Sequence, residues 1–299
     1  MDTPVTSGAT FQLRGATERG VTMSMIAVNG IELSGDQRGE GEAVVYVCGT
    51  GQPAAMWDIL GRTDVDAAGF RTIAYDNRGV QPSDVPEPPY TMQDLIDDAI
   101  AVIEHFDAAP CHLVGASLGA NIVFSVAHQR PDLVTSAVLL VGGGNFRPQT
   151  AEEMANSLDS YRQGGEAARN VQLEGLFDAM LTTAQRHDAA AQAAVEPIIE
   201  MLGNSSDDWS GAIGQATANM DWAGRDHLGD AADISVPTLM IANEGDAYFA
   251  PEDLRAAADR MADCTFVLRP GIPHVSLDPD DLNENTRLVI EFLGAHRRG

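Results

Sequence analysis

The chain has 299 residues, of which 44% are hydrophobic, so it can bury the core of one large domain or of a core domain with an insertion. Its 18 basic and 44 acidic residues give a formal net charge of −26 at pH 7. Because so acidic a surface repels nucleic acids and anionic membranes, neither is expected as a partner.

The cysteines and the hydropathy of the chain indicate the compartment. Cys48, Cys111 and Cys264 lie far apart and include no C-x-x-C pair, which argues against a disulfide framework or a zinc site and favours a reducing environment. The first residues are polar and acidic, unlike a secretion signal, and no run of about 18 apolar residues is present that could span a membrane. We therefore expect a cytoplasmic protein.

The first part of the chain alternates short apolar runs with helical patterns. Residues 23–28 predict a strand, and Asn29-Gly30 predicts a hairpin turn into a second strand at residues 31–34. Further strands are predicted at residues 43–47 and 70–75, and helices at residues 56–60 and 91–106, the second capped by Thr91. Strands that alternate with helices favour a parallel sheet.

The stretch from Cys111 to Ala120 has the clearest chemical signal. It reads as a short apolar strand, then G-x-S-x-G with Ser117 at its centre, then a helical pattern that begins at Leu118. Strand, sharp turn and helix are the context that a nucleophile elbow requires, because the tight turn projects the serine hydroxyl out of the sheet. A glycine-punctuated turn with a capping serine is the alternative for the motif taken alone.

After the strand predicted at residues 137–141, the alternation stops. Residues 145–233 are rich in alanine, glutamine and acidic side chains, and they predict helices at 151–161, 168–185, 189–201 and 209–220. The sheet pattern resumes with a strand at 238–242, followed by a helix at 251–261, a strand at 265–268 and a helix at 280–296. We therefore expect a core domain of residues 1–144 and 234–299 with a helical insertion at 145–233.

A nucleophilic serine needs a base, and the base needs an orienting acid. Asp246 and His274 each follow a predicted strand, in the chain order serine, acid, histidine, and loops at the carboxyl ends of strands are where open α/β sheets build their sites. Glu244 is the rival acid. A turn-forming role for Asp246 and a packing role for His274 are the alternatives.

An oxyanion hole is expected beside Ser117. The Leu118 amide lies at a predicted helix N-terminus, where negative charge is favoured. We expect the second donor to be the Thr50 amide, because the glycines at 49 and 51 allow the backbone to approach a substrate closely. A flexible glycine-rich turn is the alternative, and no phosphate-loop lysine follows.

Taken together, these motifs resemble the α/β-hydrolase superfamily, and most closely its esterase, enol-lactonase and cofactor-free haloperoxidase-like branch. The resemblance rests on Cys48-Gly49-Thr50-Gly51 with Trp57, Tyr75-Asp76-Asn77-Arg78-Gly79, the Ser117 elbow, Asp246 and Gly271-Ile272-Pro273-His274. It implies an α/β-hydrolase fold, with a mostly parallel twisted sheet and helices on both faces. The family usually has His-Gly where this chain has Cys48-Gly49.

The resemblance also implies that residues 145–233 form a helical cap domain that roofs the site and selects the substrate. For the substrate pocket the expected residues are Gly49, Trp57, Asn145, Trp209 and Trp222. For any single aromatic residue of the insertion, however, packing between helices is the favoured interpretation.

The sequence thus predicts a carboxylic-ester-type hydrolase with a Ser117, Asp246 and His274 triad, acting on an ester, lactone or thioester of a small apolar molecule. The alternative is a same-fold acyltransferase, cyclase or lyase of secondary metabolism, which uses these residues without net hydrolysis. No metal or organic cofactor is expected, because metal-ligand and dinucleotide motifs are missing from the sequence. A small-molecule substrate is the expected partner, and a homodimer remains open.

Overall fold

The computed structural model describes residues 24–145, 148–182, 184–202 and 208–298. Its strands form one eight-stranded sheet in the order β1-β2-β4-β3-β5-β6-β7-β8. The strands are β1 (Ser24–Val28), β2 (Ile31–Arg38), β3 (Ala43–Val47), β4 (Arg71–Tyr75), β5 (Cys111–Ala116), β6 (Val134–Leu140), β7 (Thr238–Asn243) and β8 (Cys264–Arg269). From β4 to β8 all neighbours pair in parallel, as the alternating pattern predicts.

The antiparallel edge of the sheet is built by the predicted hairpin. Asn29 and Gly30 both have positive φ angles, 47° and 81°, which suits a two-residue turn between β1 and β2. Strand β2 is longer than the predicted 31–34, because residues 35–38 pair with β4. The partner strand β4 lies far along the chain, so a pattern of neighbouring residues does not predict this pairing.

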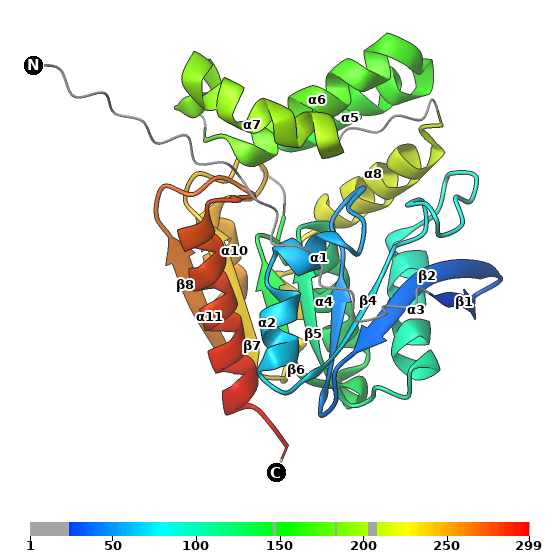
Figure 1. The fold of residues 1–299 in the computed structure, drawn as a ribbon, viewed down its shortest axis with the longest axis vertical. Helices are drawn as coiled ribbons and strands as arrows, with labels where there is room; N and C mark the ends of the chain where they lie inside the picture. Colours follow the sequence, from blue (N-terminus) through cyan, green and yellow to red (C-terminus); the bar gives the residue numbers. More distant parts are fainter. Residues whose placement is uncertain (1–23, 146–147, 183, 203–207, 299) are drawn as a thin grey trace, which may run out of the picture.

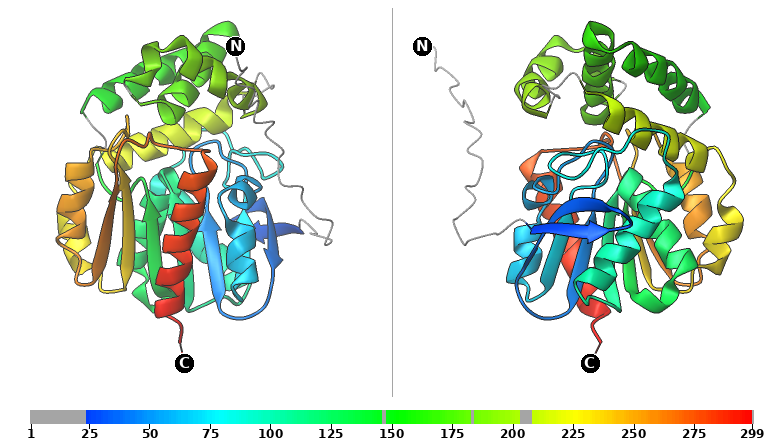
Figure 2. Two further views of the ribbon diagram at one scale, coloured as in Figure 1. Left: turned by 60° about the vertical axis from the view of Figure 1, so that its left-hand side comes forward. Right: turned by 90° about the vertical axis from the view of Figure 1, so that its right-hand side faces the viewer.

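Helices cover both faces of the sheet (Figure 2). Side chains of α1 (Met56–Ile59), α2 (Arg62–Ala67) and α11 (Pro279–Ala295) pack on one face, and those of α3 (Met92–His105), α4 (Leu118–Gln129) and α10 (Pro251–Ala258) pack on the other. The single helix predicted at 56–60 is thus a short α1 followed by α2. Thr91 caps α3 as predicted, in a reciprocal capping box with Asp94.

Between β6 and β7 the chain forms the helices α5 (Pro148–Gln163), α6 (Gly165–Met180), α7 (Ala189–Leu202), α8 (Ser210–Ala223) and α9 (Leu228–Asp233). Helices α5 to α8 lie over one end of the sheet (Figure 1). Helix α6 ends five residues earlier than predicted, and residues 185–187 form a separate 3-10 turn. Helix α9 packs against α4 and α10 of the sheet-covering layer, although it lies within residues 145–233.

Candidate active site

Ser117 occupies a strained turn between β5 and α4. Its backbone angles, φ 54° and ψ −119°, are unusual for a residue with a side chain, and such a conformation costs about 1–3 kcal/mol unless the surroundings hold it. Glycines make the turn possible. A Cβ at Gly115 would lie 2.2 Å from the Gly119 oxygen, and one at Gly119 would lie 2.0 Å from the Val47 oxygen. Strand and helix therefore approach too closely for any other residue.

Replacing Gly119 with alanine is expected to lower the free energy of unfolding by about 3 kcal/mol or more, because the added methyl group collides with rigid backbone. The matched control is Gly294→Ala in α11, where an added Cβ meets nothing within 4 Å and the glycine is exposed. That variant should be neutral or more stable by up to about 1 kcal/mol. Urea unfolding measures both, and equal stability of the two variants would contradict the close packing at the elbow.

Asp246 and His274 meet in the loops that follow β7 and β8. His274 Nδ1 lies 2.8 Å from Asp246 Oδ2, and the two residues are only 6% and 4% exposed. Asp246 Oδ1 accepts the amides of Tyr248 at 2.7 Å and Phe249 at 3.1 Å. Because a carboxylate only accepts, Nδ1 donates this hydrogen bond, and in a neutral imidazole with that tautomer the lone pair lies on Nε2.

The two loops are joined by further hydrogen bonds. The Gly245 amide donates to the Ile272 oxygen at 2.9 Å, and Asn243 Nδ2 donates to the Pro273 oxygen at 2.7 Å. The carboxyl ends of the neighbouring parallel strands β5, β6, β7 and β8 lie at one edge of the sheet. Ser117, Asp246 and His274 thus share this edge, in the loops after β5, β7 and β8.

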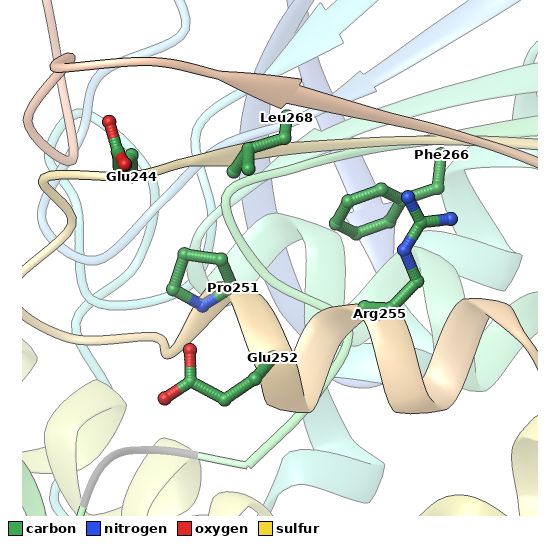
Figure 3. A pocket seen from close by; sticks show the side chains of 6 residues that line it. All are labelled: Glu244, Pro251, Glu252, Arg255, Phe266 and Leu268. Atoms are coloured by element: carbon green, nitrogen blue, oxygen red, sulfur yellow. The ribbon is translucent and has the colours of Figure 1, made fainter.

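Glu244, the rival acid, faces elsewhere. Its carboxylate accepts the Gly271 amide at 2.9 Å. Together with side chains of α10 and β8 it lines a surface hollow of about 400 Å³ (Figure 3). The residues around this hollow are Glu244, Pro251, Glu252, Arg255, Phe266 and Leu268. Neither Ser117 nor His274 belongs to this set.

Two aromatic residues enclose His274, and sequence reasoning did not single them out. The Tyr248 ring meets the imidazole edge-on at 4.9 Å between centroids, and the Phe249 ring stacks at 6.0 Å. Burial raises the pKa of Tyr248, so the hydroxyl keeps its proton and donates to the Gly175 oxygen of α6 at 2.7 Å. The Val275 amide likewise donates to the Ala179 oxygen of α6. The loops that carry Asp246 and His274 are therefore each hydrogen-bonded to helix α6.

The loop after β3 runs directly beside the serine. A Cβ at Gly49 would lie 3.5 Å from Ser117 Cβ. The Gly49 amide donates to Gln52 Oε1 at 2.9 Å, and the Gly51 amide donates to Gln215 Oε1 at 2.7 Å. Within the described residues, the amides of Thr50 and Leu118 donate to no protein acceptor. These two N–H groups are thus free to bind an anion.

Each of the tryptophans predicted for the pocket packs against another aromatic ring. Trp57 is buried against Tyr46, with ring centroids 4.9 Å apart, in the core beneath α11. Trp209 stacks on Tyr161 of α5, and Trp222 stacks on His227 at 3.8 Å. The three residues are 7% exposed or less, in keeping with the packing role favoured for any single aromatic residue, and a lining role in the substrate pocket stays a prediction. Asn145 lies half-buried in the loop after β6.

Cys48, Cys111 and Cys264 are free thiols in the structure. Burial raises the pKa of Cys48, whose sulfur lies 3.5 Å from the Tyr75 oxygen, so this thiol stays protonated and is no rival nucleophile. Among the residues that the structure describes, no group of three or more His, Cys, Asp or Glu side chains could hold a metal ion. Within the same residues, no helix is both long and apolar enough to cross a membrane.

The sequence profile of the family described as "alpha/beta hydrolase fold" matches residues 42–280. The chain belongs to the α/β-hydrolase fold family. This α/β-hydrolase is similar to BpoC of Mycobacterium tuberculosis, provisionally named a non-heme bromoperoxidase, with 29% identity over 269 residues, 88% of this chain and 98% of BpoC. It is also similar to the 2-(acetamidomethylene)succinate hydrolase of Mesorhizobium japonicum, with 26% identity, 83% of this chain and 87% of that protein.

Among solved structures, the enol-lactonase from Burkholderia xenovorans superposes with a TM-score of 0.76 at 20% identity, covering 91% of this chain and all of that one. At this identity the likeness concerns the fold. The family profile, the relatives and the fold agree with the resemblance drawn from the motifs. The protein is an enzyme of the α/β-hydrolase superfamily with hydrolase relatives.

Proposed function

We propose that the protein is a serine hydrolase that cleaves an ester, lactone or thioester of a small apolar substrate through an acyl-enzyme on Ser117. The observation that carries this proposal is the buried Asp246–His274 hydrogen bond of 2.8 Å. It orients an imidazole as a base at the sheet edge where a strained turn presents a serine. The name of the Mesorhizobium relative, a hydrolase, supports hydrolysis as the class of reaction.

In the proposed reaction, Ser117 Oγ attacks the acyl carbon while His274 Nε2 takes the hydroxyl proton. The oxyanion that forms accepts hydrogen bonds from the Thr50 and Leu118 amides, and each such donor contributes on the order of 3 kcal/mol to transition-state stabilisation. The intermediate then expels the alcohol or thiol, which leaves with the proton held by His274. Water, deprotonated by the same nitrogen, attacks the acyl-enzyme, releases the acid and restores Ser117.

We further propose that residues 145–233 act as a cap over this site. Three contacts support the cap: Tyr248 with Gly175, Val275 with the α6 carbonyl of Ala179, and Gly51 with Gln215 of α8. Each joins the helical segment to a loop that carries or flanks a proposed catalytic group. The proposed chemistry uses only side chains and backbone amides of this chain and needs no cofactor.

A fluorophosphonate probe tests the activated serine directly. Treatment of the folded protein should give a single covalent adduct, and peptide mapping should place it on Ser117, because the phosphonyl centre mimics the acyl carbon and fills the same oxyanion hole. Denatured protein is the control and should remain unlabelled. Persistent failure of the folded protein to react would shift the function to a lyase or cyclase that forms no acyl-enzyme.

A further inference from the structure

We propose that Gln215 of α8 is a positioning residue that holds the oxyanion loop, residues 48–53, in its working conformation; this assignment rests on the proposed serine hydrolysis. The side chain is 0% exposed. Its Oε1 accepts the Gly51 amide at 2.7 Å, and its Nε2 donates to the Arg78 oxygen at 2.8 Å. One carboxamide thereby bridges the loop after β3 and the loop after β4.

The orientation of this carboxamide is determined by its partners. An amide N–H requires an acceptor and a carbonyl requires a donor, so the reversed orientation would set like groups against each other at both ends. A buried polar group left without its partner is costly, which makes the bridge resistant to rotation. Gln215 therefore presents a rigidly held acceptor to the Gly51 amide.

Helix α8 packs closely against the core next to Gln215. A Cβ at Gly211 would lie only 1.9 Å from the Gly79 oxygen, so helix and loop touch backbone to backbone. Tyr90 Oη donates to the Gly211 oxygen at 3.2 Å, and Asn219 Oδ1 accepts from Asn121 Nδ2 of α4 at 2.9 Å. Because Gln215 belongs to this anchored helix, its hydrogen bond to Gly51 fixes the oxyanion loop relative to the core.

The oxyanion loop needs such support because glycines flank Thr50, whose amide is the proposed oxyanion donor. Gly49 and Gly51 give the backbone wide conformational freedom, and Gly51 has a φ of 65°. Thr50 between them is exposed, and its amide donates to no acceptor among the residues that the structure describes. Its two neighbours are each held by a glutamine, Gln52 from within the loop and Gln215 from α8. Loss of the second bond would let the Thr50 N–H turn away from the oxyanion.

The test compares Gln215→Met, which keeps the length of the side chain but removes both hydrogen bonds, with Thr217→Val on the same helix, which removes only the bond from the Thr217 hydroxyl to the Ile213 oxygen of α8. For p-nitrophenyl butyrate we expect kcat of Gln215→Met to fall on the order of 10–100-fold with KM changed less than about threefold, because an oxyanion donor acts in the transition state. Thr217→Val leaves the contacts of α8 with Gly79, Tyr90 and Asn121 in place and should change kcat less than about threefold.

A second measurement needs no turnover. Amide hydrogen exchange of residues 49–52 should accelerate on the order of tenfold in Gln215→Met and remain unchanged in Thr217→Val. An active wild type whose Gln215→Met variant keeps its kcat, or loses it without faster exchange in the loop, would overturn the positioning role alone. Equal losses of kcat in both variants would also overturn it, in favour of general packing of α8.

The rescue variant is Gln215→Glu. A neutral carboxyl group offers an acceptor to Gly51 and a donor to Arg78, as the amide does, whereas the ionised group lacks the donor. Relative to wild type, its kcat should therefore decline as pH rises and should exceed that of Gln215→Met at the acidic end. A wild type that neither turns over acyl esters nor labels at Ser117 would refute the proposed function, and the positioning role with it.

Discussion

Replacement of Ser117 by alanine is expected to reduce kcat/KM for p-nitrophenyl butyrate by roughly 10⁴- to 10⁶-fold, because the nucleophile that forms the acyl-enzyme is lost. Activity that remains would come from the oxyanion hole and from substrate binding, neither of which needs the hydroxyl. Alanine also suits the small space of the elbow, so circular dichroism and the melting temperature should match those of wild type.

The matched control is Ser125→Ala on α4, the helix that follows Ser117. Ser125 is buried, and its hydroxyl donates only to the Asn121 oxygen of its own helix at 2.8 Å, so its loss should change kcat/KM less than about twofold. Retention of activity in folded Ser117→Ala protein, free of contaminating esterase, would refute the proposed mechanism.

The second large effect is expected for Asp246→Asn. The amide oxygen can still accept the amides of Tyr248 and Phe249, but its NH₂ group then faces His274 Nδ1. That nitrogen must become an acceptor, which moves the proton to Nε2 and removes the base, and the imidazolium also loses its counter-charge. We expect kcat to fall on the order of 10⁴-fold while the protein stays folded.

Glu244→Gln is the matched control for this substitution, because it removes a carboxylate only two positions away. The glutamine oxygen can still accept the Gly271 amide, so kcat/KM should remain within about threefold of wild type. The reverse pattern, with near-normal activity in Asp246→Asn and collapse in Glu244→Gln, would show that the acid is Glu244 and would leave the roles of Ser117 and His274 intact.

Features that depend on a few neighbouring residues were predictable from the sequence. The Asn29-Gly30 hairpin, the Thr91 cap of α3 and the strand–turn–helix around Ser117 all form as predicted. Each is governed by local backbone sterics, by side-chain bonds to the nearest amides, or by a periodicity that extends over about ten residues. The parallel sheet follows from the regular alternation of such local units, and the family profile agrees with it.

Errors arose where distant segments decide the outcome. Strand β2 extends past residue 34 because it pairs with β4, which begins some 30 residues later. The neighbours of the three tryptophans were likewise beyond the reach of sequence patterns, because the rings of Tyr46, Tyr161 and His227 that pack against them come from other segments or from a separate turn. An aromatic side chain is equally apolar whether it lines a pocket or packs in a core, so only its neighbours in the structure distinguish these two roles.

The sequence by itself determined the elbow, the order of serine, acid and histidine, and the alternation that builds the sheet, since all of these are properties of the chain read in order. Only the tertiary structure decided which carboxylate meets the imidazole. Asp246 and Glu244 both follow β7 and lie two positions apart, yet the first accepts from His274 and the second from the Gly271 amide. Only it brought Gln215 to Gly51, which lies 164 positions earlier in the chain. The physical reason is that a hydrogen bond depends on the positions of two atoms in space, and those positions are set by the packing of whole helices on the sheet.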